Sequence, residues 1–267
     1  MVERQVGNIE RESPPKYSAI VLPSYGMSRF SLADAPVALQ QQVMNGERSF
    51  NEYRVSAFGG WECRAGFEVA LDIWRTEGYW PYIIIGGAKI FKGDPKNDGD
   101  SMKSLLLRLR DRETGVSIPE ERIIQTRDAT NTYNQLLHAR NAIRGLGIRG
   151  RILTIHADLH EYRVPTLVDR YGMNSDTAIA EDILSDRYPA FRSVWDEGYV
   201  DRQGVFQLGM KHDPSYKKTK ELEANLARLL VFDRWGHFAR LASRVAFIKK
   251  GSADVPDVRH RQTVRSY

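Results

Sequence analysis

The chain has 267 residues, of which 42% are hydrophobic and 27% charged, and its mean hydropathy is −0.47. These values are typical of one large globular domain, with or without an extension, and they exclude a collagen, a long disordered chain and a disulfide scaffold. The net charge of +5 lies at one end, because residues 238–267 hold seven Lys or Arg and two Asp, while the rest of the chain is balanced. Residues 1–237 therefore have no net charge that would attract the phosphates of a nucleic acid, and we do not expect a nucleic-acid partner.

The cysteine content, the first residues and the apolar runs of the sequence favour a cytoplasmic location. The single cysteine, Cys63, cannot form an intramolecular disulfide, and no C-x-x-C pair is present to hold zinc. Residues 1–16 are mixed in charge and have no apolar core, unlike a signal peptide. The longest apolar runs are too short to cross a bilayer. We expect a cytoplasmic protein with no membrane partner.

Strand and helix patterns alternate along most of the chain. Short β-branched runs predict strands at 17–23, 82–85, 121–126, 151–155 and 177–180. Apolar residues at helical spacing predict helices at 64–76, 102–109, 130–146 and 162–171. Because alternating strands and helices form βαβ units, we predict an α/β fold: a Rossmann-like three-layer αβα sandwich with a mainly parallel sheet and a C-terminal helical extension.

The same patterns divide the chain in two. We predict a Rossmann-like domain over residues 1–185, with an insertion at 24–60 whose polar sequence gives no clear prediction of secondary structure. We predict a helical extension and a basic tail over 186–267. Residues 217–250 carry apolar positions at helical spacing, interrupted near Trp235-Gly236, which indicates two helices. These helices pack on the body or on a second subunit, so a homodimer formed through them is one prediction.

Polar residues and glycines follow each predicted strand, where the loops of a parallel sheet meet at one edge. Ligands bind at that edge because helix N-termini and loops converge there. The residues in these positions are Ser24, Tyr25 and Gly26, then Gly86, Gly87 and Lys89, then Asp128, Asn131 and Thr132, then His156, Asp158, His160 and Arg163.

Each of these groups has a structural alternative. The Gly86-Gly87 pair permits either close approach of a ligand or a tight turn. Asp128, Thr130 and Asn131 at the start of a helix would cap it in any protein. We favour that structural role for Asp128 and Thr130, whereas Asn131 and Thr132 are better candidates for ligand contact.

The sequence His156-Ala-Asp158-Leu-His160 is the densest titratable cluster. If it is extended, its three polar side chains share one face and can bind a divalent metal. If the strand ends near Ile155 and a helix starts near His160, they diverge and His160 lies one turn from Arg163. An imidazole and a guanidinium at that position suit an anionic group, as acid/base and bidentate clamp. We favour the anion over the metal; a purely structural role is the third alternative.

Four segments, taken together, resemble one protein family. They are YSAIVLPSYG, ECRAGFEVALDIWRTEGYWPYIIIGGAK, ERIIQTRDATNTYNQLLHAR and RILTIHADLHEYRVPTLVDRYG. This succession resembles the YdcF/SanA/ElyC-like family of bacterial proteins, long described only as a domain of unknown function. The family's usual marks are an arginine that opens the first long helix, a strand ending Ser-Gly-Gly, an Asn-Thr near the start of a later helix, and a strand followed by His-x-x-Arg. Here the matching residues are Arg64, Gly86-Gly87, Asn131-Thr132 and His160-x-x-Arg163.

The resemblance covers roughly residues 17–172 and implies a Rossmann-like fold with a polar pocket at the strand ends. It also implies a link to envelope biogenesis and a nucleotide or S-adenosylmethionine-like ligand, but no settled reaction. The segment 24–60 and the C-terminal helices lie outside it, where a specialised substrate would be selected. The chain departs from the family pattern at four places: Ile85 for the serine, Asn134-Gln135 for Glu-Asn, His156-Ala157 for Thr-Ser, and Met102 for an acidic residue.

The leading hypothesis is an enzyme that acts on a phosphorylated, nucleotide-like or other anionic small molecule by hydrolysis or group transfer. We predict His160, Arg163 and Asp158 as catalytic residues. We predict ligand contacts from Ser24, Tyr25, Arg64, Gly86, Gly87, Lys89, Asn131, Thr132 and His156. The first alternative is a non-catalytic module for a nucleotide or S-adenosylmethionine-like ligand. The second is a metal-dependent hydrolase built on His156, Asp158 and His160, although we do not expect a divalent metal.

Overall fold

The computed structural model describes residues 17–24, 27–29, 37–47, 53–55, 57–87, 98–126, 129, 131–200 and 205–232. Several predicted features lie outside these residues. They are the strand-end residues Tyr25, Gly26 and Lys89, the capping candidates Asp128 and Thr130, the second C-terminal helix and the basic tail.

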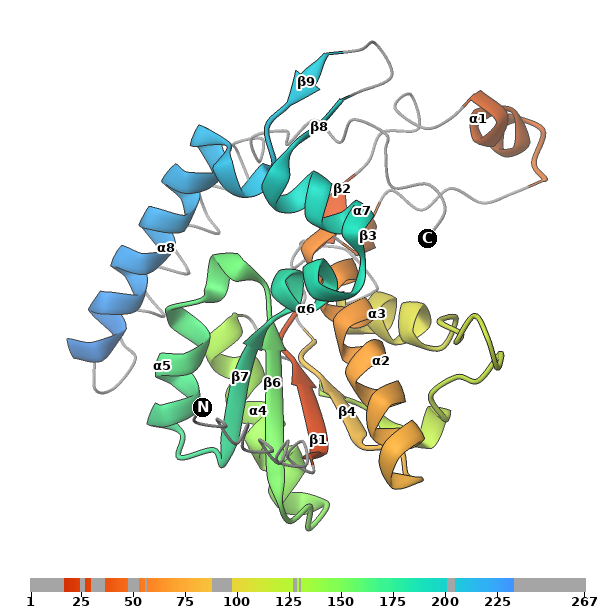
Figure 1. The fold of residues 1–267 in the computed structure, drawn as a ribbon. Helices are drawn as coiled ribbons and strands as arrows, with labels where there is room; N and C mark the ends of the chain where they lie inside the picture. The colour runs from red at the N-terminus through yellow and green to blue at the C-terminus, as the bar shows by residue number, and fades with distance from the viewer. Residues whose placement is uncertain are drawn as a thin grey trace, which may run out of the picture.

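A five-stranded sheet forms the centre of the molecule (Figure 1). Its strands are all parallel and lie in the order β5-β4-β1-β6-β7. Their bounds are Tyr17–Leu22 for β1, Tyr82–Ile85 for β4, Ile123–Gln125 for β5, Arg151–His156 for β6 and Ser175–Ile179 for β7. Most residues of β1, β4 and β6 are apolar and buried because helices cover both faces of the sheet. The predicted three-layer α/β fold is confirmed.

Two helical layers enclose the sheet, and alternate strand residues point to each. Ile20 and Leu22 of β1 pack into a core with α2 (Ala57–Glu77), α3 (Asp98–Leu106) and α6 (Ala180–Arg187). Ala19 and Val21 pack on the other face, in a core with α4 (Thr132–Gly145) and α5 (Arg163–Arg170). Figure 1 shows α2 and α3 on one side of the sheet and α4 and α5 on the other.

The strand order reverses at the middle of the sheet. From β1 the chain adds β4 and then β5 on one side, and it later adds β6 and β7 on the other. The carboxyl ends of β1 and β6, at Leu22 and His156, therefore flank the point where the following helices diverge to opposite faces. This switch point is where open α/β sheets form their ligand crevice.

The segment 24–60 contains short elements that hydrophobic periodicity cannot reveal. They are an antiparallel pair of strands, β2 (Met27–Arg29) and β3 (Tyr53–Val55), and a helix, α1 (Val37–Met44). The next helix, α2, begins at Ala57, seven residues before the predicted Arg64. Gly59-Gly60 weakens the helical signal at its start. Packing overrides that weakness, because Phe58 and Trp61 join an aromatic cluster.

The extension after α6 forms a third, smaller core against the body. It contains α7 (Pro189–Arg192), a π-helical turn, the hairpin β8 (Tyr199–Val200) and β9 (Phe206–Gln207), and α8 (Pro214–Phe232). Trp195 and Tyr216 stack edge to face, with ring centroids 5.4 Å apart, and pack with Phe58 and Trp61. The predicted helical extension is confirmed over α8, whereas the division at residue 185 falls inside α6 and stays a prediction.

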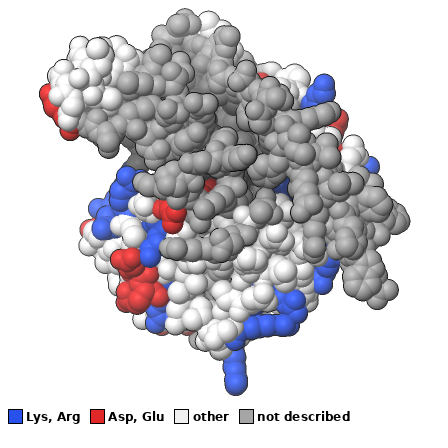
Figure 2. Space-filling model, turned by 180° about the vertical axis from the view of Figure 1, so that it is seen from behind, with Lys and Arg blue, Asp and Glu red and all other residues white. Residues whose placement is uncertain are grey.

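The described surface mixes charges. Figure 2 shows Lys and Arg side chains next to Asp and Glu at one side of the described surface, and Lys and Arg side chains alone along its lower edge. Among the described helices, none is both long enough and apolar enough to cross a membrane.

Candidate functional site

A buried polar cluster lies next to the switch point, at the carboxyl ends of β1 and β4. It consists of Ser24, just after β1, Asp98 at the start of α3, and Gln135 in the first turn of α4. The Ser24 hydroxyl donates to a carboxylate oxygen of Asp98, and the Gln135 amide donates to the Ser24 hydroxyl oxygen at 2.5 Å. All three residues are at most 5% exposed. Three elements far apart in the chain thus place hydrogen-bonding groups at one edge of the sheet.

Gly86 lies against this cluster for a packing reason. A Cβ atom at Gly86 would lie 2.9 Å from the Cβ of Gln135, so only glycine lets α4 approach the end of β4. The backbone N–H of Gly86 donates to the Leu22 carbonyl at 2.9 Å, and the Gly87 carbonyl accepts from Ala129 at 3.2 Å. The space beside Gly86 is therefore filled by Gln135, and the predicted ligand contact of this pair stays a prediction.

Asn131 and Thr132 begin α4 beside the same cluster. Asn131 is the N-cap, and its side-chain oxygen accepts from the backbone N–H of Asn134 at 2.9 Å. Thr132 is buried, and Gln135 follows one turn later. Helix α4 thus begins two residues after the predicted start at residue 130, and the capping contact satisfies one of the free amides there.

The cluster predicted as catalytic diverges after β6. Arg163 donates to Nε2 of His160, which is 3% exposed, and burial and that guanidinium both lower the pKa of His160 well below its usual value. Asp158 points instead toward α8, and Nδ1 of His156 lies 3.0 Å from the Ala157 carbonyl. These three side chains do not share a face. No group of three or more His, Cys, Asp or Glu among the described residues is arranged to hold a metal ion.

Helix α8 binds directly to the predicted catalytic residues. Tyr216 donates to one oxygen of Asp158 at 2.7 Å, and Lys220 pairs with the other at 2.8 Å. Glu223 lies 3.2 Å from the guanidinium of Arg163. The charges predicted to serve a ligand are thus paired with the extension, which sequence patterns could not reveal because the partners lie about 60 residues apart.

Two buried glutamates hold the backbone at the end of β6. Glu62 of α2 accepts from the N–H of Ala157, and Glu181 of α6 accepts from the N–H of Asp158, both at 2.9 Å. Burial raises the pKa of Glu62 well above its usual range and the pKa of Glu181 to about 8. Each glutamate has a second, buried oxygen with no hydrogen-bond partner among the described residues, where the proton of the neutral form belongs.

Arg64 belongs to α2, and its side chain contacts the start of the extension rather than the residues at the strand ends. It pairs with Glu68 at 2.6 Å and donates to the hydroxyl of Tyr188 at 2.7 Å. Arg187 joins the same network through Glu68. The geometry therefore does not bring Arg64 together with Ser24 or His160 in the described part of the chain.

Sequence reasoning missed Asp98, Gln135, Glu62 and Glu181. Glu62 carried one signal: it lies between Trp61 and Cys63, where a charged residue interrupts an apolar stretch. Gln135 stands at one of the positions that depart from the YdcF-like pattern. Asp98 carried none, because its role depends on Ser24, 74 residues earlier.

The sequence after β1 bears on which cofactor fits. It reads Pro23-Ser24-Tyr25-Gly26 and does not contain the G-x-G-x-x-G motif that brings the backbone close to a dinucleotide's pyrophosphate. Within the described part, Ser24, Thr132 and the first amides of α4 are the groups suited to a smaller nucleotide-like or adenosyl ligand.

Comparison with known proteins does not add an identity. No protein-family model matches the chain, and neither a curated protein nor a solved structure does.

Proposed function

We propose that this protein binds a phosphorylated, nucleotide-like or other anionic small molecule at the carboxyl ends of β1 and β4, and converts it by hydrolysis or group transfer. The observation that carries the proposal is the buried cluster of Ser24, Asp98 and Gln135 next to the switch point. Burying polar groups costs stability, and such groups concentrate at functional sites. Ligands of open α/β sheets bind beyond the carboxyl ends of the strands, in the crevice beside the switch point.

Two features support an anion as ligand. The first turn of α4, a 14-residue helix, directs N–H groups and a positive dipole end toward this edge. Arg163 supplies a guanidinium beyond the end of β6, and an anion there competes with Glu223 for it. The neutral imidazole of His160 contacts Arg163 and can accept a proton once the guanidinium engages the ligand.

Several predictions from the sequence belong to this proposal and rest on the sequence alone. They are the YdcF-like family, an S-adenosylmethionine-like or nucleotide ligand, a cytoplasmic location, and dimerisation through the C-terminal helices.

The proposal is tested by ligand binding to the full chain. We expect a thermal shift with at least one of ATP, AMP, S-adenosylmethionine or inorganic phosphate. Ser24→Ala should weaken that binding by about tenfold, because it removes the hydroxyl of the cluster. Ser104→Ala is the matched control, since Ser104 bonds only within α3. No shift with any of these ligands, or equal effects of the two variants, would count against the site. If His160→Ala left both affinity and turnover unchanged, His160 would have no acid/base role.

A second candidate function is binding without turnover. The observation that favours it is the pairing of Asp158 with Tyr216 and Lys220, and of Arg163 with Glu223, which occupies the groups a catalytic site would present. Prolonged incubation with the stabilising ligand, followed by mass spectrometry, separates the two functions. Full recovery of the unmodified ligand favours binding alone, and a product favours the enzyme.

A further inference from the structure

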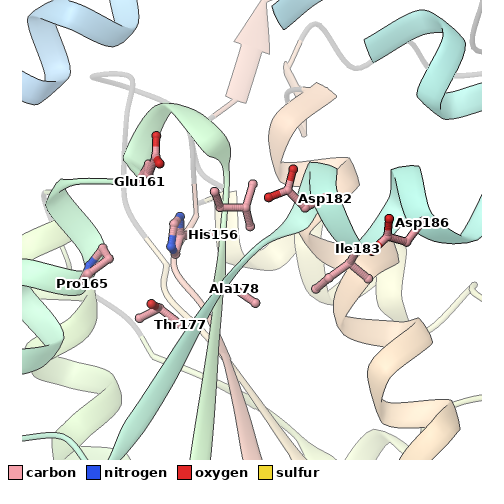
Figure 3. Close-up of a pocket in the computed structure, with 9 residues that line it drawn as sticks. His156, Glu161, Pro165, Thr177, Ala178, Asp182, Ile183 and Asp186 are labelled. Atoms are coloured by element: carbon pink, nitrogen blue, oxygen red, sulfur yellow. The ribbon is translucent and has the colours of Figure 1, made fainter. Parts of the chain in front are cut away.

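A pocket lies at the ends of β6 and β7, away from the Ser24 cluster. Its volume is about 440 Å³, and its lining comes from β6, β7, α5, α6 and the segment that joins β6 to α5 (Figure 3). Its walls combine apolar side chains such as Ile179 and Ile183 with the polar side chains of His156, Glu161 and Asp182. None of the lining residues belongs to β1, β4 or α4, so this pocket is separate from the site proposed above.

His156 supplies an unpartnered acceptor to this pocket. It is 2% exposed and lines the cavity. Its Nδ1 lies 3.0 Å from the Ala157 carbonyl, and a carbonyl only accepts, so Nδ1 carries the hydrogen. Burial lowers the pKa of His156, which keeps the ring neutral and leaves a lone pair on Nε2. No described residue donates to that nitrogen, so it is available to accept a hydrogen bond from a ligand in the pocket.

The charges around the pocket favour a cation as ligand. Glu161, Asp182 and Asp186 line it, whereas no Lys or Arg is among the lining residues. The neighbouring basic groups lie outside the lining. Lys220 pairs with Glu161 and with Asp158, and Arg192 lies 3.8 Å from Asp186. The positive charge of Lys211 acts to lower the pKa of Asp182. The wall of the pocket thus presents three carboxylates, and the basic partners of these carboxylates lie outside the lining.

We infer that this pocket binds a small organic monocation, a primary alkylammonium, with its N–H groups directed to His156 and its charge near Asp182. The apolar chain of such a ligand packs against Ile179 and Ile183. A single ammonium supplies both a donor for Nε2 of His156 and a positive charge for the carboxylates of the wall. A divalent metal fits less well, because the described carboxylates and histidines do not converge in a group that could hold one.

The test is calorimetric titration of the full chain with n-pentylamine, which is cationic at neutral pH, against 1-pentanol, which has the same apolar chain and no charge. We expect binding of the amine at concentrations up to about 10 mM and none of the alcohol. Asp182→Asn should weaken binding about tenfold, whereas Asp169→Asn, the same change on the exposed surface of α5, should leave it unchanged.

A spectroscopic measurement on the unmodified chain makes the test independent of folding in the variants. Accepting a hydrogen bond moves the ¹⁵N resonance of His156 Nε2 upfield, so pentylamine should shift it and pentanol should not. The inference is overturned if the two compounds bind equally, if neither binds, if the two Asp variants behave alike, or if the resonance does not move. A ligand found for the Ser24 cluster has no bearing on these outcomes.

Discussion

Glu181 shows how the fold changes the chemistry of one residue. It is fully buried at the start of α6 and accepts the N–H of Asp158. Burial is the largest influence on it and raises the pKa to about 8, while the nearby charge of Asp158 acts in the same direction. A carboxyl group that is neutral at pH 7 in the folded chain ionises near 4.5 when the chain unfolds.

This difference predicts a pH dependence of stability. Between about pH 4.5 and 8 the folded chain retains the Glu181 proton and the unfolded chain loses it, so the free energy of unfolding falls as the pH rises. Glu181→Gln keeps the accepting oxygen and removes the proton, so it should stabilise the protein at pH 8 by on the order of 4 kcal/mol and have little effect at pH 4. Urea unfolding across this range measures the difference.

The matched control is Glu221→Gln, on the exposed surface of α8, which should change stability by less than about 0.5 kcal/mol at every pH. A Glu181→Gln effect that is the same at pH 4 and pH 8 would contradict a raised pKa in the folded chain.

Among the elements, α8 makes the least expected contribution. It packs an aromatic residue, Tyr216, into the cluster with Trp195, and it pairs Lys220 with both Asp158 and Glu161. The extension therefore completes the environment of the segment 158–163, which follows β6. The surroundings of the predicted catalytic residues are in part a product of the C-terminal extension.

Lys220→Met tests this role of α8. The change removes the ion pair and leaves the carboxylate of Asp158, which is 4% exposed, with Tyr216 as its remaining side-chain partner from α8. Loss of one partner from a buried pair costs about 3 kcal/mol, so we expect lower stability and faster amide exchange in residues 214–232. Lys217→Met, on the exposed side of the same helix, should change neither. Equal behaviour of the two variants would show that the aromatic contacts alone hold α8.

At the scale of the whole molecule, stability should be uneven. The central strands β1, β4 and β6 are buried on both faces by two apolar cores, whereas the hairpin of β8 and β9 exposes more than half of Val200 and of Phe206. Amide exchange of the central strands therefore requires global unfolding, and exchange of the hairpin requires only local opening.

Hydrogen exchange followed by mass spectrometry measures this difference. We expect peptides from β1, β4 and β6 to be the most protected and the peptide that contains β9 to exchange orders of magnitude faster. Comparable protection in the two regions would mean that the hairpin and the sheet unfold as one cooperative unit.

The sequence by itself determined the βαβ order, the parallel sheet and the edge where polar residues gather. These features depend on local periodicity and turn residues, as in the Ile83–Ile85 run and the Asn131 cap. The tertiary structure decided which side chains meet there. Ser24 meets Asp98 and Gln135, and Asp158 meets Lys220, over separations of 62 to 111 residues. The strand order and the path of α8 set those pairings, and no local pattern encodes them. The net charge of +5 lies outside these contacts, in the tail; at the site, burial and pairing of individual groups set the electrostatics.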